Sequence, residues 1–450
     1  MTATGSGTLA GIADGLDAGG IESFRSLRLP DDFAPTRFLE APRRHEVVAS
    51  YERPDRGIAL VGLGEAGRAS SPLGSGPGGA RDDARALFQA PWQAGDAALR
   101  PRVLGGFAFR SDREPSGPWS GFGVGSLVLP RMLVVQDGDV RGVVVSPGVS
   151  AAEVGTRLAA LEEATEAPSD PDGSPLRAAR GIDRDGWRAS VQAIATEVRA
   201  GVYEKVVLAT TQEFERDRDI DLGRTLERLR ANYPECHVFS VTRGDATFLG
   251  ASPELLVAMR DGRMETLGLA GSARRGATPE QDDEIGQALL ASAKDRMEHE
   301  TVVRAIREAL AGVTERLVAP NQPRLRRLRN IQHLATEIGG RVRRGVDILE
   351  LVERLHPTPA VCGWPRLAAQ HVISVLESFD RGWYAGPIGW MDANGEGEFA
   401  VGLRVALVRH ARAWLFAGNG IMGDSDPDSE LAEVQLKFRP LTEALSGVSS

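Results

Sequence analysis

Apolar positions in the second half of the chain follow two different periods. Residues 183–215 begin with apolar side chains three and four apart, as on one face of a helix, and end in a β-branched run that predicts a strand. Residues 237–276 indicate several strands joined by glycine-containing turns, and residues 279–313 indicate one long helix or two. Residues 395–422 alternate around a turn, as a hairpin does. Strands, then helices, then strands favour an α+β fold with mainly antiparallel sheets.

The first 180 residues are less regularly patterned. Residues 1–24 are rich in glycine, alanine, aspartate and threonine and are predicted to be disordered. Residues 64–85 are predicted to form a flexible loop that leads into a helix. A Pro- and Asp-rich break at 163–181 separates an N-terminal part of the fold, 25–180, from the part that carries the candidate chemistry, 181–445.

Composition excludes several classes of protein. With 450 residues, 42% of them hydrophobic and 26% charged, the chain can form a large core. Its net charge of −9 argues against a nucleic-acid or anionic-membrane partner, because both select a clustered basic surface. Cys236 and Cys362 lie far apart and outside any CxxC pattern, which argues against disulfides and structural zinc. The start resembles no signal or transit peptide, and no apolar run reaches the roughly 20 residues of a membrane span. We therefore expect a cytoplasmic protein, a monomer or homodimer.

The most distinctive segment near the C-terminus reads "AGNGIMGDSDPDSELAEVQLKF". Asp426 followed by proline predicts a helix start, and Glu430, Glu433 and Lys437 then share one face of that helix. Acids in a first turn are favoured by the helix dipole, so a solvated, well-capped helix explains them. The alternative explanation is a Mg²⁺ site, because stacked carboxylates repel one another unless a cation lies between them.

Three further residues are candidates for acid, base or metal chemistry. Glu298 lies in the charge run "KDRMEHE", which by itself is typical of a solvated helix face. Glu254 in "GASPELLV" adjoins an apolar run, where burial would raise the pKa of its carboxyl. Lys205 precedes the apolar strand of "EKVVLA", so it either extends to the surface or loses its charge more easily than usual.

Other segments offer groups that bind anions. The backbone N–H groups of Gly271 and Ser272 in "LAGSARRG" can cradle an anion. Arg404 in "VGLRVALV" is expected in a strand, where an inward-pointing arginine needs an anionic partner.

In their order and content these segments resemble the chorismate-utilising enzymes, the family of isochorismate, salicylate, anthranilate and aminodeoxychorismate synthases. The resemblance covers residues 184–441 through "KVVLA", "GASPELL", "LAGSARRG", "KDRMEHE", "QHLAT", "HPTPAVCGWPR", "YAGPIGW", "VGLRVALV" and "GNGI" before the final acidic helix. It implies an α+β fold with a large antiparallel β-sandwich flanked by helices.

Within the family the chain is most similar to isochorismate synthases. The lysine of "EKVVLA", the "HPTPAVCG" loop and "QHLAT" carry this likeness. Aminodeoxychorismate synthases often have a lysine nucleophile where this chain has Ala270, and anthranilate synthases generally lack a lysine at position 205. A salicylate synthase and a non-catalytic chorismate-binding protein are the alternatives. A product that feeds siderophore synthesis and one that feeds menaquinone synthesis are equally compatible with the sequence.

The resemblance also implies roles for individual residues. Lys205 matches the base that activates water, and Glu254 matches the acid that protonates the departing hydroxyl. The expected ligands of Mg²⁺ are Glu298, Glu433 and Glu430. The expected substrate-binding residues are Gly271, Ser272, His333, Arg404, Gly418 and Lys437.

The chain departs from the family pattern at three positions. The family commonly has arginine where this chain has Thr210, an aromatic residue at Leu431, and histidine at Met297. None of the three is a proposed catalytic group. Thr210 is the one feature that favours the non-catalytic alternative.

Overall fold

The computed structural model describes most of the chain. The described residues are Ala13, Leu16, 22–40, 46–92, 96–163, 175–329 and 331–447. Most of the predicted disordered segment at 1–24 and most of the predicted break at 163–181 lie outside these residues.

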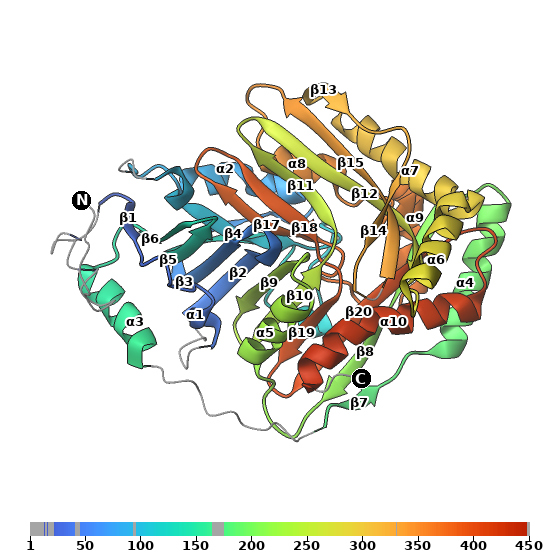
Figure 1. Cartoon of the computed structure of the whole chain (residues 1–450), viewed down its shortest axis with the longest axis horizontal. Coiled ribbons are helices and arrows are strands. Elements are labelled where there is room, and N and C mark those ends of the chain that lie inside the picture. The colour runs from blue at the N-terminus through green and yellow to red at the C-terminus, as the bar shows by residue number, and fades with distance from the viewer. Residues whose placement is uncertain are drawn as a thin grey trace.

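In chain order, six strands before residue 150, blue to teal in Figure 1, are followed by fourteen strands in the rest of the described chain. The N-terminal strands are β1 (Arg25–Arg28), β2 (Val47–Arg53), β3 (Ile58–Ser70), β4 (Arg102–Phe107), β5 (Gly125–Asp137) and β6 (Val140–Val145). The C-terminal strands are β7 (Arg177–Arg180), β8 (Lys205–Glu215), β9 (His237–Arg243), β10 (Ala246–Ser252), β11 (Leu255–Arg260), β12 (Arg263–Arg274), β13 (Thr314–Val318), β14 (Arg324–Arg327), β15 (Ile331–Val342), β16 (Gly363–Trp364), β17 (Pro387–Asp392), β18 (Gly397–Val401), β19 (Val405–Arg409) and β20 (Arg412–Ile421).

The helices cover the ends and faces of the strands. They are α1 (Arg37–Glu40), α2 (Arg81–Ala86), α3 (Ala151–Glu163), α4 (Arg184–Arg199), α5 (Leu222–Asn232), α6 (Pro279–Ala291), α7 (Ala293–Leu310), α8 (Ile348–Leu355), α9 (Arg366–Leu376) and α10 (Pro427–Ser446). The predicted helical segment at 279–313 is therefore two helices. They are separated at Ser292, whose side chain accepts a hydrogen bond from the backbone N–H of Asp295 and so caps α7.

One connected sheet divides into two branches at β5. From β5, one branch runs through β3, β2, β9, β10, β19 and β20 to β8. The other runs through β4, β17, β18, β11 and β12 to β15. We call these the β8 branch and the β12 branch. All these pairs are antiparallel, so the predicted α+β fold with a large antiparallel sheet flanked by helices is confirmed.

The far ends of both branches meet beside the same helices. Helix α7 packs on β12 and α10 packs on β20, and Figure 1 shows α6, α7 and α10 gathered on the right, beside these strands. Residues distant in sequence are thereby brought to one place between the branches.

The predicted flexible loop at 64–85 is wrong over residues 64–70, whereas residues 71–76 belong to no helix or strand and a helix follows, as predicted. Residues 64–70 continue β3 and pair with β5 from Glu65↔Pro130 to Ser70↔Ser126, and α2 starts at Arg81. The alternation that marks a strand is weak here because this end of β3 carries small and charged side chains, several of them exposed. Pairing with a long neighbouring strand decides the conformation where local propensity does not.

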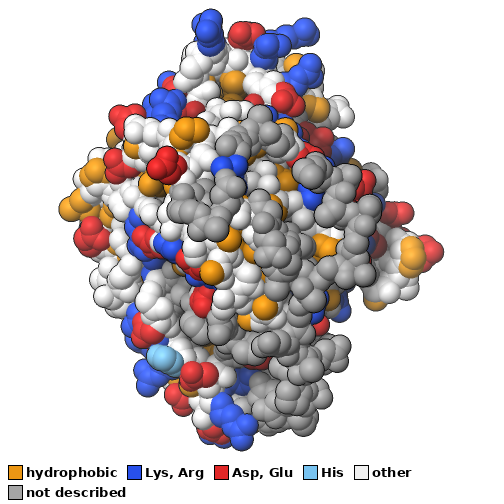
Figure 2. All heavy atoms as spheres, turned by 90° about the vertical axis from the view of Figure 1, so that its left-hand side faces the viewer, with side chains coloured by type: hydrophobic (Ala, Val, Ile, Leu, Met, Phe, Trp, Pro, Cys, Tyr) orange, Lys and Arg blue, Asp and Glu red, His pale blue; other side chains and the backbone are white. Residues whose placement is uncertain are grey.

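Charges on the surface are mixed rather than sorted. On the face shown in Figure 2, the described Lys and Arg side chains are interspersed with Asp and Glu side chains. None of the helices in the described part of the chain combines the length and the apolar character that crossing a bilayer requires.

Candidate active site

A cavity of about 330 Å³ lies where the two branches meet. It is lined by residues of β8 and β20 on one side, by residues of β12 and β15 on the other, and by residues of α7 and α10. Every site residue predicted from the sequence lines this cavity: Lys205, Glu254, Gly271, Ser272, Glu298, His333, Arg404, Gly418, Glu430, Glu433 and Lys437. The structure thus brings all of them together, and their individual roles stay predictions.

Lys205 is buried at the start of β8. Its side chain is 2% exposed, and its Nζ lies 2.6 Å from Oε1 of Glu298 on α7. Gly420 on the neighbouring strand makes room for it, because a Cβ there would lie 2.2 Å from Cε of Lys205. The alternative of a lysine extending to the surface is therefore wrong.

Glu254 is buried in the turn between β10 and β11. It is 5% exposed, and burial raises the pKa of its carboxyl to about 8, although the nearby charge of Lys205 opposes the rise. The backbone N–H of Val401 donates to the Glu254 carbonyl at 3.0 Å and fixes the turn. A carboxyl with this pKa is protonated at neutral pH and can donate a proton.

Helix α10 directs its acidic face into the cavity, as the residue spacing predicts. Glu430 accepts hydrogen bonds from Oγ of Ser425 at 2.7 Å and from Nδ2 of Asn419 at 2.9 Å. Burial, together with repulsion from Glu433, raises the pKa of the Glu430 carboxyl. The interpretation of Glu430 as part of a solvated helix face is therefore wrong.

Glu433, together with Lys437 on the same helix, joins α10 to both branches. Oγ of Ser272 on β12 donates to its Oε1 at 2.8 Å, and Nζ of Lys437 lies 3.0 Å from the same atom. Lys437 also donates to Oδ1 of Asn419 at 2.6 Å and to the Gly418 carbonyl at 3.0 Å on β20. Burial raises the pKa of the Glu433 carboxyl, but the charge of Lys437 and the Ser272 hydrogen bond outweigh it, so the net shift is downward.

A fifth acidic side chain, Asp295, lines the same cavity and was missed in the sequence. Burial and the charges of Glu298 and Glu433 raise the pKa of its carboxyl, although its hydrogen bond with Ser292 opposes the rise. The sequence feature that could have identified Asp295 is its position three residues before Glu298, which places both side chains on the same side of α7.

The carboxylates of the cavity suit a hard divalent cation in donor chemistry, since Mg²⁺ and Ca²⁺ prefer oxygen ligands. Among the described residues, however, no three acidic, histidine or cysteine side chains are already grouped closely enough to hold a metal ion. Lys205 is paired with Glu298 and Lys437 with Glu433. To bind a cation, Glu298 and Glu433 would therefore have to exchange their lysine partners for the ion.

His333 offers an acceptor to the cavity. Burial, with the charges of Arg404 and Lys437, lowers its pKa to about 3, so the ring is neutral. Its Nε2 has no hydrogen-bond partner in the part of the chain that the structure describes. Ser272 on β12 lies opposite His333 and directly follows a bulge at Gly271, whose φ of 74° favours glycine.

Arg404 does not lie in a strand, contrary to the sequence-based expectation. It occupies the bend between β18 and β19 with a φ of 50°, which the apolar residues on either side do not reveal. The half-buried side chain lines the cavity, and no ion pair to its guanidinium is found among the residues described. It presents a free cation to an anionic ligand.

The three departures from the family pattern all lie off the cavity. Met297 is 62% exposed, Leu431 belongs to the core, and Thr210 lies on β8 beyond the lining residues. They leave the groups of the site intact. A larger hollow of about 940 Å³ elsewhere is lined by Met259, Arg263 and others and contains none of the site residues.

Comparison with known proteins points to one family. Residues 25–446 match the family model described as chorismate binding enzyme. The chain is 42% identical over 366 residues to the salicylate biosynthesis isochorismate synthase of Pseudomonas aeruginosa, covering 78% of this chain and 76% of the relative. It is 35% identical over 357 residues to the isochorismate synthase MenF of Bacillus subtilis, with coverages of 78% and 76%.

A solved structure agrees with the sequence comparison. The menaquinone-specific isochorismate synthase MenF of Escherichia coli superposes with a TM-score of 0.79 at 25% identity, covering 97% of this chain and 99% of the other. Fold, matched length and relatives together show that the chain belongs to the chorismate binding enzyme family.

Proposed function

We propose that this chain is an isochorismate synthase, which converts chorismate to isochorismate. The observation that carries the proposal is the combination of a buried lysine, Lys205, and a carboxyl protonated at neutral pH, Glu254, in one cavity. The named relatives are isochorismate synthases, which supports the same activity.

The reaction needs a base and an acid on different sides of the substrate ring. Lys205, as the neutral amine, takes a proton from a water molecule whose oxygen bonds to C2. The electrons of the ring diene shift, the bond between C4 and its hydroxyl breaks, and Glu254 gives its proton to the departing hydroxyl. One water enters and one leaves, and solvent returns the proton from Lys205 to Glu254, so the reaction is a balanced isomerisation and is expected to be reversible.

The proposed cofactor is Mg²⁺, held by Glu298, Glu430 and Glu433. When bound, it supplies an electrostatic clamp for the ring carboxylate of chorismate. If Glu298 turned to the ion, it would no longer pair with Lys205, and Nζ of Lys205 would be free to hydrogen-bond water. The neutral His333 and the cationic Arg404 complete the set that orients the substrate.

Arg404→Ala is expected to raise KM for chorismate with much less change in kcat. The guanidinium faces the cavity without an anionic partner among the described residues, so it is suited to hold a substrate carboxylate in the ground state and the transition state alike. Steady-state kinetics measure the split. An unchanged KM would remove Arg404 from the binding residues.

The pKa of Glu254 predicts the alkaline limit of activity. Because the acid works only when protonated, kcat/KM, which reports the free enzyme, is expected to fall as pH rises through about 8 and to be retained below it. Because the pKa of Glu254 is raised in the folded state, burial of this carboxyl lowers the free energy of unfolding progressively as pH rises from the pKa of the unfolded chain toward 8. A pH profile of kcat/KM recorded with unfolding monitored separates the two effects, and a kcat/KM that stays level well above pH 8 would contradict the assignment.

Product analysis separates the proposed activity from the alternatives. Chromatography after incubation with chorismate and Mg²⁺ is expected to show isochorismate. Fluorescent salicylate would instead identify a salicylate synthase, which also eliminates pyruvate, and unchanged chorismate would identify a binding protein. The cytoplasmic location, the oligomeric state and the menaquinone or siderophore pathway stay predictions.

A further inference from the structure

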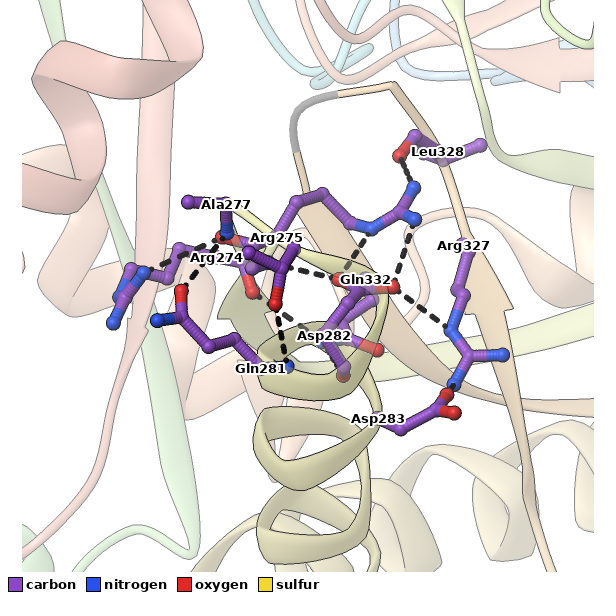
Figure 3. Close-up of polar contacts among 11 residues, drawn as sticks. Arg274, Arg275, Ala277, Gln281, Asp282, Asp283, Arg327, Leu328 and Gln332 are labelled. Carbon is purple, nitrogen blue, oxygen red and sulfur yellow. Dashed lines mark hydrogen bonds and ion pairs between the residues drawn. The ribbon is translucent and has the colours of Figure 1, made fainter.

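A polar cluster lies where β12 ends (Figure 3), close in sequence to Gly271 and Ser272, which line the cavity. At its centre is Asp282 in the first turn of α6, which is 6% exposed. Nε and Nη2 of Arg275 donate to its two carboxylate oxygens at 2.7 and 2.8 Å, and the backbone N–H of Gly276 donates at 2.9 Å. Nε of Arg327 at the end of β14 lies 3.2 Å away. One carboxylate therefore joins the exit of β12, the start of α6 and the end of β14.

Gln332 adds a second connection. Its side chain is fully buried, and its Nε2 donates to the carbonyls of Arg274 and Asp282, each at 3.3 Å. It is the residue directly before His333 on β15, and it lies opposite Ala273 on β12. The pair Ala273 and Gln332, which carries the cluster, is therefore adjacent to the pair Ser272 and His333 in the β12–β15 pairing. Both Ser272 and His333 line the cavity.

The ladder on the other side of this pair is irregular. The register of β12 against β15 shifts between Ala270 and Ser272, at the left-handed Gly271. A bulge weakens the constraint that regular pairing places on its neighbours. On the C-terminal side of Ser272, Asp282 holds residues 275 and 276 and so adds a constraint that the bulge does not weaken.

We propose that Asp282 is a positioning residue, which holds Ser272 and His333 in place at the wall of the cavity. Through Ser272, whose Oγ donates to Glu433 at 2.8 Å, it also sets the position of a carboxylate of the proposed metal site. The consequence for substrate rests on the proposed function, whereas the consequence for the backbone does not.

The neighbouring Asp283 provides a matched control. It has the same side chain on the same helix, is largely exposed, and pairs with Arg327 at 2.6 Å. Asp282→Asn is expected to speed amide hydrogen exchange in peptides covering 268–277 and 331–336, and Asp283→Asn is expected to leave both peptides as in the wild type. This readout requires no turnover.

Kinetics supply the second readout. Asp282→Asn is expected to raise KM for chorismate about tenfold, the effect of losing one charged hydrogen bond, with a smaller change in kcat. A merely structural role would lower the melting temperature and leave KM of the folded enzyme unchanged. Should Asp282→Asn fail to fold, Arg275→Lys keeps the charge, loses the two-pronged contact and is expected to give the same exchange pattern.

The outcomes are distinct. Unchanged exchange at both peptides in Asp282→Asn, or in its replacement Arg275→Lys, would overturn the proposal, as would equal effects of Asp282→Asn and Asp283→Asn. A wild type inert toward chorismate would instead refute the proposed function, while the exchange comparison would still decide the role of Asp282.

Discussion

Lys205→Ala is expected to lower kcat for chorismate by about 10²–10⁴-fold, the usual contribution of a general acid–base group, with a much smaller change in KM. The lysine is 2% exposed, and it lies in the cavity beside the buried Glu254. Glu254→Gln keeps the shape of its side chain but has no acidic proton, and it is expected to lose kcat over the same range. Steady-state kinetics in both directions measure these losses.

Glu204→Ala is the matched control for Lys205. Glu204 directly precedes it but is half exposed and paired with Arg304 on the outside of α7. Its variant is expected to retain wild-type kinetics. If Lys205→Ala keeps kcat within a few-fold, the assignment of the base fails.

Glu298→Gln and Glu433→Gln are each expected to lower turnover by more than about 100-fold. Replacing a residue that only hydrogen-bonds a metal ligand costs up to about 100-fold, and replacing a ligand itself should cost more. Each change removes a negative charge from the face that α7 or α10 presents to the cavity, and so weakens the proposed Mg²⁺ site. The measurement is activity titrated against Mg²⁺, in which both variants require far more of the ion.

Glu300→Gln, an exposed position on the same helix as Glu298, is the control and is expected to behave as the wild type. EDTA is expected to inactivate the wild type reversibly. Near-wild-type activity of Glu298→Gln or Glu433→Gln at limiting Mg²⁺ would show that the site is misplaced.

The candidate site is largely predictable because its groups lie in short local motifs. The spacing of Glu430, Glu433 and Lys437 places them on one helical face in any context. The apolar neighbours of Glu254 in the sequence indicate a buried carboxyl, and burial is what raises its pKa.

The partners of these groups are not predictable in the same way. The ion pair of Lys205 with Glu298 joins residues 93 positions apart, and the hydrogen bond of Ser272 to Glu433 spans 161 positions. Both depend on how two branches of one sheet meet, which no local pattern encodes.

The errors of prediction have a common physical cause. The polar end of β3 has the composition of a loop, because its pairing with β5 is invisible in its own side chains. Arg404 has the apolar neighbours of a strand residue, although the backbone turns there with a positive φ. In each case tertiary pairing, rather than local preference, sets the conformation.

The most direct test of the account is incubation of the wild-type protein with chorismate and Mg²⁺ in water enriched in oxygen-18, followed by chromatography and mass spectrometry. Addition of water at C2 with loss of the C4 hydroxyl predicts isochorismate that carries one oxygen-18 atom, at C2. Unlabelled isochorismate, or no isochorismate at all, would contradict it.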